Sequence, residues 1–308
     1  MPRKKPSPRK ASEIAALLRV NPGAKFKIKD HRTDWRGAKA LRDLSKDELK
    51  EKSRTYVERT LENLAQHQEL LYANDIYSVL IIFQAMDAAG KDGMIKYVTS
   101  GLNPQGCQVF SFKAPSDEDL DHNFLWRYSK CLPERGRIGI FNRSYYEETL
   151  VVRVHPKLLE RQKLPPGKRG RSFWKARYED INNFERHLTR NGTLILKFFL
   201  NISKAEQKKR FRDRLTNPEK HWKFSPADLA ERGCWDAYQE AFEETINATT
   251  TKWAPWHVVP SDHKWVARAT VSAVIKHGIK SLGLRSPVLP AEKLKALATA
   301  RRKLLPRD

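Results

Sequence analysis

The segment SVLIIFQAMDAAGKDG, residues 78–93, constrains this chain more than any other. Val79 to Phe83 form an uninterrupted apolar run, too short for an independent helix, which is typical of a strand buried on both faces. Small residues then form a turn that ends at Lys91, where a helical pattern begins. Backbone N–H groups and the positive end of the helix dipole converge at such a junction, so the segment predicts an anion-binding cradle.

The loop only partly matches the phosphate-loop pattern G-x-x-x-x-G-K-[ST]. Ala85 stands where the pattern has its first glycine, and Asp92 replaces the hydroxyl residue that would hold magnesium. The order of strand, loop and helix favours phosphate binding over the alternative, an ordinary turn with a surface lysine. The candidate phosphate-binding residues of the loop are Ala88, Ala89, Gly90, Lys91, Asp92 and Gly93.

Asp87 is the residue of this loop that bears most on its chemistry. A carboxylate beside bound phosphates would repel them unless a cation lay between. We therefore interpret Asp87, with Asp92 as a candidate second ligand, as a divalent-metal ligand. The alternative is a solvated loop aspartate.

The positive charge of the chain is concentrated in short segments. The formal net charge is +23, and residues 153–177 and 204–223 carry most of the excess outside the basic termini. Such focusing indicates a polyanionic partner. Nucleic acid, an anionic membrane surface and an inorganic phosphate chain would all satisfy it.

Two further features concern the compartment. The chain has no apolar run of membrane-spanning length, and residues 1–12 lack the apolar segment of a secretory signal, so we expect a cytoplasmic protein. Cys107, Cys131 and Cys234 lie far apart without metal-ligand spacing, which is typical of reduced structural thiols.

Strand and helix patterns alternate along the middle of the chain. Strands are predicted at residues 79–84, 107–112, 137–141, 193–200 and 256–259. This alternation predicts an α/β fold, a three-layer sandwich in which helices cover both faces of a five-stranded parallel sheet. We expect a basic flexible arm over residues 1–24, a single domain over 25–284 and a basic C-terminal tail over 285–308.

Candidate anion ligands lie near the ends of these elements. Asn142 and Arg143 directly follow the third strand, and the carboxyl ends of parallel strands line the ligand crevice. Arg210 and Arg214 lie one turn apart on a predicted helix. With a second helix beginning at Pro226, they form a hairpin over about residues 204–232 that could close as a lid. Arg127 is a weaker candidate, beside an apolar helical stripe.

Together these parts are those that phosphoryl transfer requires. The reaction needs neutralised charge, alignment and exclusion of water rather than covalent help from the protein. Lys91, Arg143, Arg210 and Arg214 could neutralise and align the phosphates, and the lid could exclude water.

Several long motifs resemble those of the type 2 polyphosphate kinase family. They are QAMDAAGKDG, SGLNPQGCQVFSFKAPS, FLWR, IGIFNRSYYEETLVVRVHP, NPEKHWKFSPADL and APW, and the likeness spans roughly residues 25–285. The resemblance implies a thymidylate-kinase-like P-loop kinase fold with a helical lid. It also implies that inorganic polyphosphate donates a phosphoryl group to a nucleotide with Mg²⁺, or Mn²⁺ in its place.

The resemblance also implies roles for individual residues. Asp87 is the loop metal ligand, Lys91 the phosphate-binding lysine and Arg143 the phosphate clamp. Cations of the lid or of the polyphosphate path are Arg210, Arg214, Lys220 and Lys223.

Asn142 is similar to the third class of the family, which phosphorylates both nucleoside mono- and diphosphates. The other two classes carry aspartate there, so a metal-binding role for Asn142 is the least supported of these roles. AMP, ADP and guanine nucleotides are the implied acceptors, and the family likeness suggests a homo-oligomer of two or four chains.

Two alternative functions stay open on the sequence alone. One is a nucleotide kinase that uses ATP as its donor, which the same loop could serve. The other is a nucleic-acid-binding protein whose loop is vestigial. Single-strand binding favours aromatic residues among the cations, and residues 153–172 contain none, so nucleic acid is the less favoured partner.

Overall fold

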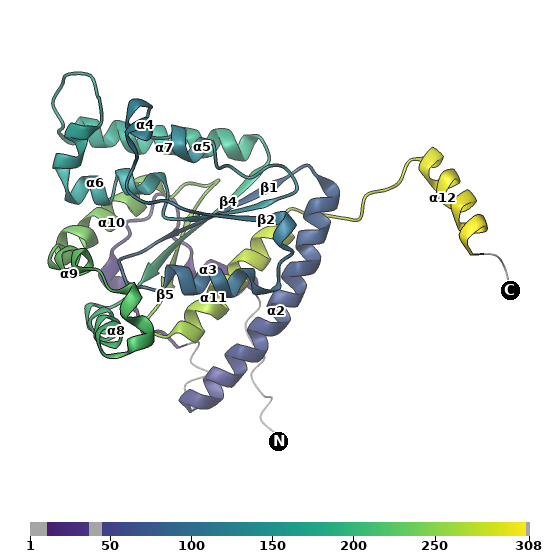
Figure 1. The fold of residues 1–308 in the computed structure, drawn as a ribbon, viewed down its shortest axis with the longest axis horizontal. Coiled ribbons are helices and arrows are strands. Elements are labelled where there is room, and N and C mark those ends of the chain that lie inside the picture. The colour runs from purple at the N-terminus through teal and green to yellow at the C-terminus, as the bar shows by residue number, and fades with distance from the viewer. Residues whose placement is uncertain (1–10, 37–44, 306–308) are drawn as a thin grey trace.

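The computed structural model describes residues 11–36 and 45–305. At its centre lies a five-stranded, all-parallel sheet with the strand order β2-β3-β1-β4-β5 (Figure 1). The predicted α/β fold is confirmed, and each strand overlaps its predicted range. The strands are β1 Ser78–Gln84, β2 Cys107–Ser111, β3 Ile138–Asn142, β4 Thr193–Asn201 and β5 Trp256–Pro260.

β1 occupies the central position because its sequence is apolar throughout. All seven of its residues are buried, and it pairs with β3 on one side and β4 on the other. A strand with neighbours on both edges and helices on both faces has no side open to water, which matches an uninterrupted apolar run.

Helices form a layer on each face of the sheet, which gives the predicted three layers (Figure 1). α2 Lys46–Asn74 and α3 Lys91–Val98 pack with α11 Lys264–Ser281 on one face. α7 Arg171–Arg190 and α10 Trp235–Thr249 pack on the other, beside the short α6 Val151–Val154. α2 begins at a capping box, in which Ser45 and Glu48 exchange hydrogen bonds between side chain and backbone.

Two predicted helices are broken. The apolar helical stripe beside Arg127 predicts a single helix from Ser116 to before Pro133, but the structure has α4 Asp117–Asp121 and α5 Trp126–Ser129. The Asn123 side chain accepts a hydrogen bond from the backbone N–H of Leu125 at 3.0 Å, and such a local bond starts a new turn. The helix predicted from Pro226 onward divides into α9 Pro226–Gly233 and α10, because Gly233 weakens the helix at that point.

The predicted flexible arm over residues 1–24 differs from the structure where it is described. Residues 1–10 lie outside the described part, but Ala11–Leu18 form helix α1, which packs against α11. The Val20 N–H donates to the Trp256 carbonyl of β5 at 2.8 Å. Burial of Ala15, Leu18 and Val20 anchors this stretch to the domain, a signal that its basic surroundings masked in the sequence.

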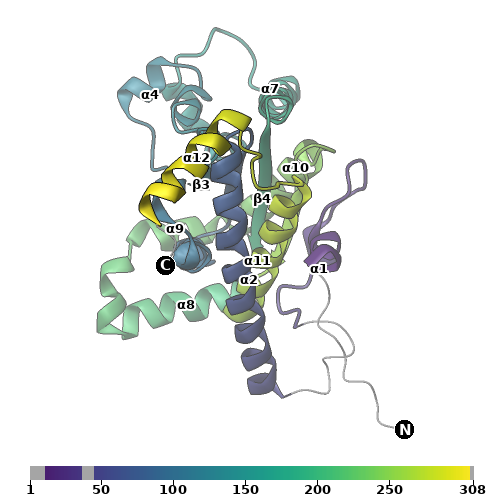
Figure 2. The same cartoon turned by 90° about the vertical axis from the view of Figure 1, so that its right-hand side faces the viewer.

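The predicted C-terminal tail contains a helix that the sequence patterns did not indicate. α12 Ala291–Leu304 lies away from the body of the domain in Figure 1 and is drawn in front of it in Figure 2. Every one of its residues is exposed. The end of the tail, residues 306–308, lies outside the described residues. None of the helices within residues 11–36 and 45–305 combines the length and apolar character needed to cross a bilayer.

A buried histidine on β5 makes the stability of the fold depend on pH. His257 is 5% exposed, and burial lowers its pKa from 6.5 to about 4. The unfolded chain therefore takes up this proton at a higher pH than the folded chain does. The stabilisation is present in full above pH 6.5 and is lost as the pH falls toward 4.

We expect His257→Gln to remove this part of the acid sensitivity. Between pH 7 and 4 the free energy of unfolding of the unmodified protein should fall by about 3 kcal/mol more than that of the variant. Urea unfolding at pH 7, 5.5 and 4 measures the difference. Equal losses in the two proteins would contradict the assignment.

Candidate functional site

A cavity of about 580 Å³ lies at the carboxyl ends of the central strands. Its walls come from the loop between β1 and α3, the end of β3, the hairpin that contains α8 Lys204–Thr216, and the start of α11. The structure brings together nearly all of the predicted site residues here. Those that line the cavity are Asp87, Ala88, Ala89, Gly90, Lys91, Asp92, Gly93, Asn142, Arg143, Arg210, Arg214, Lys220 and Lys223.

The loop before α3 has the backbone of an anion cradle. Gly90, at φ 104°, is the N-cap of α3, and no described side chain caps the helix there. The first N–H groups of a helix have no partner within the helix, so this end of α3 offers donors and a positive dipole to the cavity. Ala88 also adopts a left-handed conformation, at φ 59°, which is uncommon for a residue with a side chain.

Lys91 is folded back onto its own loop. Its Nζ donates to the Ala85 carbonyl at 2.8 Å and to the Met86 carbonyl at 3.5 Å. Burial, and next the neighbouring Arg143 guanidinium, lower the pKa of Lys91, while nearby carboxylates oppose the shift. An ammonium group has three donors, so Lys91 retains one for an anion in the cavity.

Arg143 forms the charged centre of the site. Its guanidinium donates to Asp87 Oδ1 at 3.0 Å and to Glu147 Oε2 at 3.2 Å. The Glu147 carboxylate is the main cause that raises the pKa of Arg143, against the effect of burial. Arg143 therefore stays charged, and it holds the Asp87 carboxylate at the edge of the loop.

Asn142 is the adjacent polar residue at the end of β3. Its Nδ2 donates to Asp92 Oδ1 at 2.7 Å and to Ser111 Oγ at 3.3 Å. Its Oδ1 is buried and accepts no hydrogen bond from the described residues. The amide oxygen is thus available as a ligand atom.

The cavity fits Mg²⁺ of the kind that is bound together with phosphates. Mg²⁺ commonly takes one or two protein oxygens and completes its coordination with water and substrate oxygens. Asp87 and the Asn142 Oδ1 atom could supply the protein oxygens from the wall of one cavity. Within residues 11–36 and 45–305, no three His, Cys, Asp or Glu residues gather into a ready-made metal site.

Arg210 supports the loop through its backbone. Its guanidinium donates to the carbonyls of Ala88 at 3.1 Å and Ala89 at 2.7 Å, and to the Ser261 carbonyl at 2.6 Å. Its Nε donates to Glu206 at 2.9 Å. In this geometry Arg210 joins the loop to the end of β5, and its role as a phosphate ligand stays a prediction.

Two of the other predicted lid cations, Arg214 and Lys220, are paired with neighbouring acids. Arg214 contacts Asp228 at 2.7 Å, and Lys220 contacts Asp213 at 2.7 Å. Asp228 belongs to α9, so the first contact ties the two helices of the hairpin together. Burial, and next the Asp87 carboxylate, raise the pKa of Asp228, against the effect of Arg214.

Arg127 does not join this group. Its guanidinium contacts Asp119 at 3.3 Å and donates to the Lys113 carbonyl at 3.1 Å. It is not among the described residues that line the cavity, and its role as a phosphate ligand stays a prediction.

The sequence analysis missed three cations of the cavity. Lys113 follows β2, and Lys264 and Arg268 lie on the first turns of α11 after β5. Burial, and next Arg210 and Lys220, lower the pKa of Lys264. Lys113 and Lys264 could have been found by the strand-end rule that identified Asn142 and Arg143, whereas Arg268 lies too far along α11 for that rule.

Comparison with known proteins agrees with this geometry. The family model of polyphosphate kinase 2 (PPK2) matches residues 44–285. An ADP-polyphosphate phosphotransferase of Rhodopseudomonas palustris is 54% identical, over 85% of this chain and 89% of its own length. An AMP/ADP-polyphosphate phosphotransferase of Meiothermus ruber is 42% identical, over 87% of this chain and 94% of its own.

A solved structure is similar as well. The crystal structure of polyphosphate kinase 2 from Arthrobacter aurescens superposes with a TM-score of 0.81 at 37% identity. The match covers 95% of this chain and 97% of that one.

The contacts of Arg210 predict a loss of stability on substitution. Arg210→Gln should lower the free energy of unfolding by about 2–3 kcal/mol, because buried carbonyls of the loop lose charged donors. The control is Lys209→Gln on the same helix, whose side chain is 80% exposed. Urea unfolding measures both, and equal changes would contradict the supporting role.

Proposed function

The chain belongs to the polyphosphate kinase 2 family, and from this premise we propose that it transfers the terminal phosphoryl group of inorganic polyphosphate to nucleoside mono- and diphosphates. It has the P-loop kinase fold of its structural neighbours. The observation that carries the proposal is the cavity at the strand ends. An uncapped helix N-terminus and many cations meet there beside the Asp87 carboxylate.

The reaction joins an oxygen of the acceptor phosphate to the terminal phosphorus of the chain. The bond from that phosphorus to the bridging oxygen breaks, and the remaining polyphosphate leaves one unit shorter. AMP becomes ADP, and ADP becomes ATP. Both substrates are anions, so the protein must first overcome their mutual repulsion.

Each group of the cavity has a place in this reaction. The N-terminal N–H groups of α3 and the Lys91 ammonium bind phosphate oxygens, and Arg143 orients the transferred group. Asp87, with Asn142 as a second oxygen ligand, would hold Mg²⁺. When bound, Mg²⁺ would neutralise charge on the phosphates. Mn²⁺ has the same preference for oxygen ligands.

The hairpin of α8 and α9 would act as the lid. Arg214 and Lys220 form ion pairs with Asp228 and Asp213 in this structure. A polyphosphate chain would have to displace these carboxylates in order to bind the two cations. Lys223 and Lys264 line the same cavity and extend the cationic wall. Polyphosphate carries one negative charge per unit, so its charge is complementary to this cationic wall.

The nature of the acceptor rests on two observations. The name of the Rhodopseudomonas relative contains ADP alone, whereas that of the Meiothermus relative contains both AMP and ADP. Asn142 stands where the resemblance places the class that uses both. We propose that this chain also accepts both, guanine nucleotides included. The homo-oligomeric state and the cytoplasmic location stay predictions.

Neither alternative function is favoured. An ATP-dependent nucleotide kinase would use the same loop, but the relatives over most of the chain are named polyphosphate phosphotransferases. The same names give no support to a nucleic-acid-binding protein.

A donor and acceptor panel tests the proposal. Purified protein with Mg²⁺ and long-chain polyphosphate should convert ADP to ATP and AMP to ADP with no other donor, as measured by chromatography of the nucleotides. Omission of the divalent cation should abolish the conversion. Turnover with ATP as donor but none with polyphosphate would identify an ordinary kinase instead.

Two loop substitutions test the site. Lys91→Ala and Asp87→Asn should each lower kcat by roughly 10²–10³-fold, because each removes charge that the transition state requires. Lys96→Ala is the control, since Lys96 is exposed on the same helix α3. Circular dichroism should show folded protein in every case. If both loop variants kept activity within a few-fold of the unmodified protein, Lys91 and Asp87 would have no part in the mechanism.

A further inference from the structure

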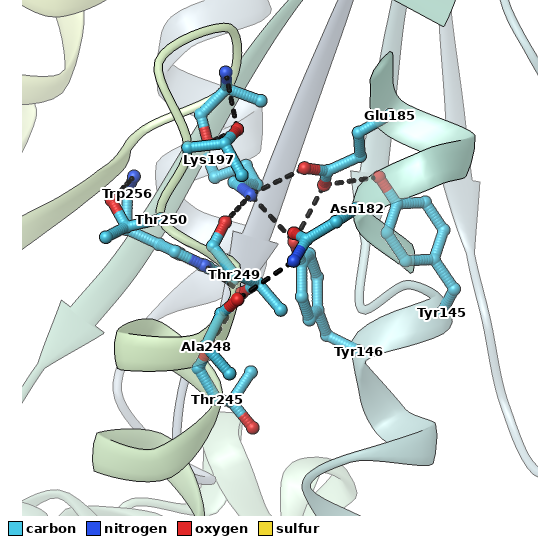
Figure 3. Close-up of polar contacts among 12 residues, drawn as sticks. Tyr145, Tyr146, Asn182, Glu185, Lys197, Thr245, Ala248, Thr249, Thr250 and Trp256 are labelled. Atoms are coloured by element: carbon cyan, nitrogen blue, oxygen red, sulfur yellow. Dashed lines mark hydrogen bonds and ion pairs between the residues drawn. The ribbon is translucent and has the colours of Figure 1, made fainter. Parts of the chain in front are cut away.

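A buried ion pair lies beneath the site, in the part of the molecule that Figure 3 shows. Lys197 interrupts the apolar sequence of β4, and its side chain is fully buried. It contacts Glu185 of α7, also fully buried, at 2.7 Å. The remaining donors of Lys197 reach Tyr146 Oη at 2.7 Å and the Thr249 carbonyl at 2.8 Å, so the ammonium is fully satisfied.

The pair binds two consecutive tyrosines. The Tyr145 and Tyr146 hydroxyls both donate to Glu185 Oε1, at 2.9 Å and 2.7 Å. Burial, and next the Glu185 charge, raise the pKa of both tyrosines well above the usual range. The hydroxyls therefore remain protonated donors at neutral pH. Figure 3 shows both rings directed toward Glu185.

These tyrosines directly follow the segment that carries Arg143. Tyr145–Glu148 form a 3-10 turn whose N-cap is Ser144. Ser144 Oγ accepts hydrogen bonds from Gln84 Nε2 at 3.2 Å and from the Tyr146 N–H at 3.3 Å. The turn is thus tied to β1 at its start and to the buried pair through its first two side chains.

Arg143 itself has a strained backbone. Its φ is 66°, in the left-handed region, which is unfavourable for a residue with a side chain. It persists only where the surroundings fix it. On one side its N–H donates to the Phe83 carbonyl at 3.1 Å. On its C-terminal side, the hydrogen bonds from Tyr145 and Tyr146 to Glu185 hold the backbone that follows Arg143.

We propose that Glu185 and Lys197 are positioning residues for phosphoryl transfer, acting through Tyr145 and Tyr146 to keep Arg143 in its left-handed conformation beside Asp87. The inference rests on the proposed function, in which Arg143 touches the transferred phosphoryl group.

A role in core stability alone does not explain this arrangement. The desolvation of two buried charges offsets much of their attraction, and apolar replacements of such pairs are often as stable. An apolar pair would fill the space between β4 and α7 but could not accept hydrogen bonds from two tyrosine hydroxyls. What the ion pair adds is therefore a fixed direction for the tyrosines and for the turn that follows Arg143.

Two sets of variants test the proposal. The mild one is Tyr146→Phe, which removes one hydroxyl and leaves the ion pair. The stronger one is the double substitution Glu185→Leu with Lys197→Met, which removes both charges together. We expect kcat to fall by about tenfold or more, because a misplaced catalytic group loses transition-state contact, while KM for ADP and for polyphosphate changes by less than about twofold.

The decisive measurement is a double-mutant cycle with Arg143. In an Arg143→Lys background, Tyr146→Phe should cause little further loss of kcat, because the group that it positions is already altered. A merely structural role predicts the same fold-loss in both backgrounds. The proposal is overturned if the losses multiply, or if kcat is unchanged in Tyr146→Phe and in the double substitution.

Controls separate this test from folding and from the proposed function. Val274→Ala in α11, on the other face of the sheet, leaves a core cavity and should lower the melting temperature without lowering kcat at 25 °C. All variants are assayed well below their melting temperatures. If the unmodified protein failed to use polyphosphate, the proposed function would fail. The same cycle, run with the donor that does work, would still decide whether the pair acts through Arg143.

Discussion

Mutual repulsion among cations is the constraint on which this structure depends. The loop, the end of β3, the lid hairpin and α11 all direct positive groups at one cavity, where unpaired they would push these elements apart. The structure gives most of them a local partner. Arg143 lies between Asp87 and Glu147, Arg214 contacts Asp228, and Arg210 binds backbone carbonyls. An arriving polyanion therefore competes with weak internal partners rather than with water alone, and the cavity keeps its shape before the substrate binds.

The fold was largely predictable because each strand of a covered parallel sheet is a short apolar run with clear ends. All five were found, and the strand-end rule then placed Asn142 and Arg143 at the site. The same rule would have placed Lys113 and Lys264, had it been applied to β2 and β5. Sequence patterns gave wrong helix predictions where local contacts or neighbouring residues obscured the apolar periodicity. Asn123 breaks a helix that its apolar stripe predicted, and the apolar side of α1 was hidden among basic residues.

The roles of two cations could not be read from sequence for a different reason. Arg210 and Lys197 are both positive, but whether a cation faces a ligand or the protein depends on which acceptors the fold brings within reach. Arg210 meets carbonyls from two distant segments, and Lys197 meets a carboxylate from α7. A lone lysine inside the apolar run of β4 was nonetheless a usable signal, because a charge in such a strand requires a buried partner.

The placement of α12 has a consequence for how the molecule melts. The helix is 14 residues long, all of them exposed, and Leu294 and Leu297 are 52% and 57% exposed. A helix of that length without tertiary burial is only marginally stable in water. Its helix–coil equilibrium therefore responds to temperature and salt independently of the rest of the domain. Its ellipticity would decline gradually on heating, long before the cooperative transition of the sheet and its covering layers. Calorimetry and far-ultraviolet spectroscopy would therefore report different melting behaviour for one and the same chain.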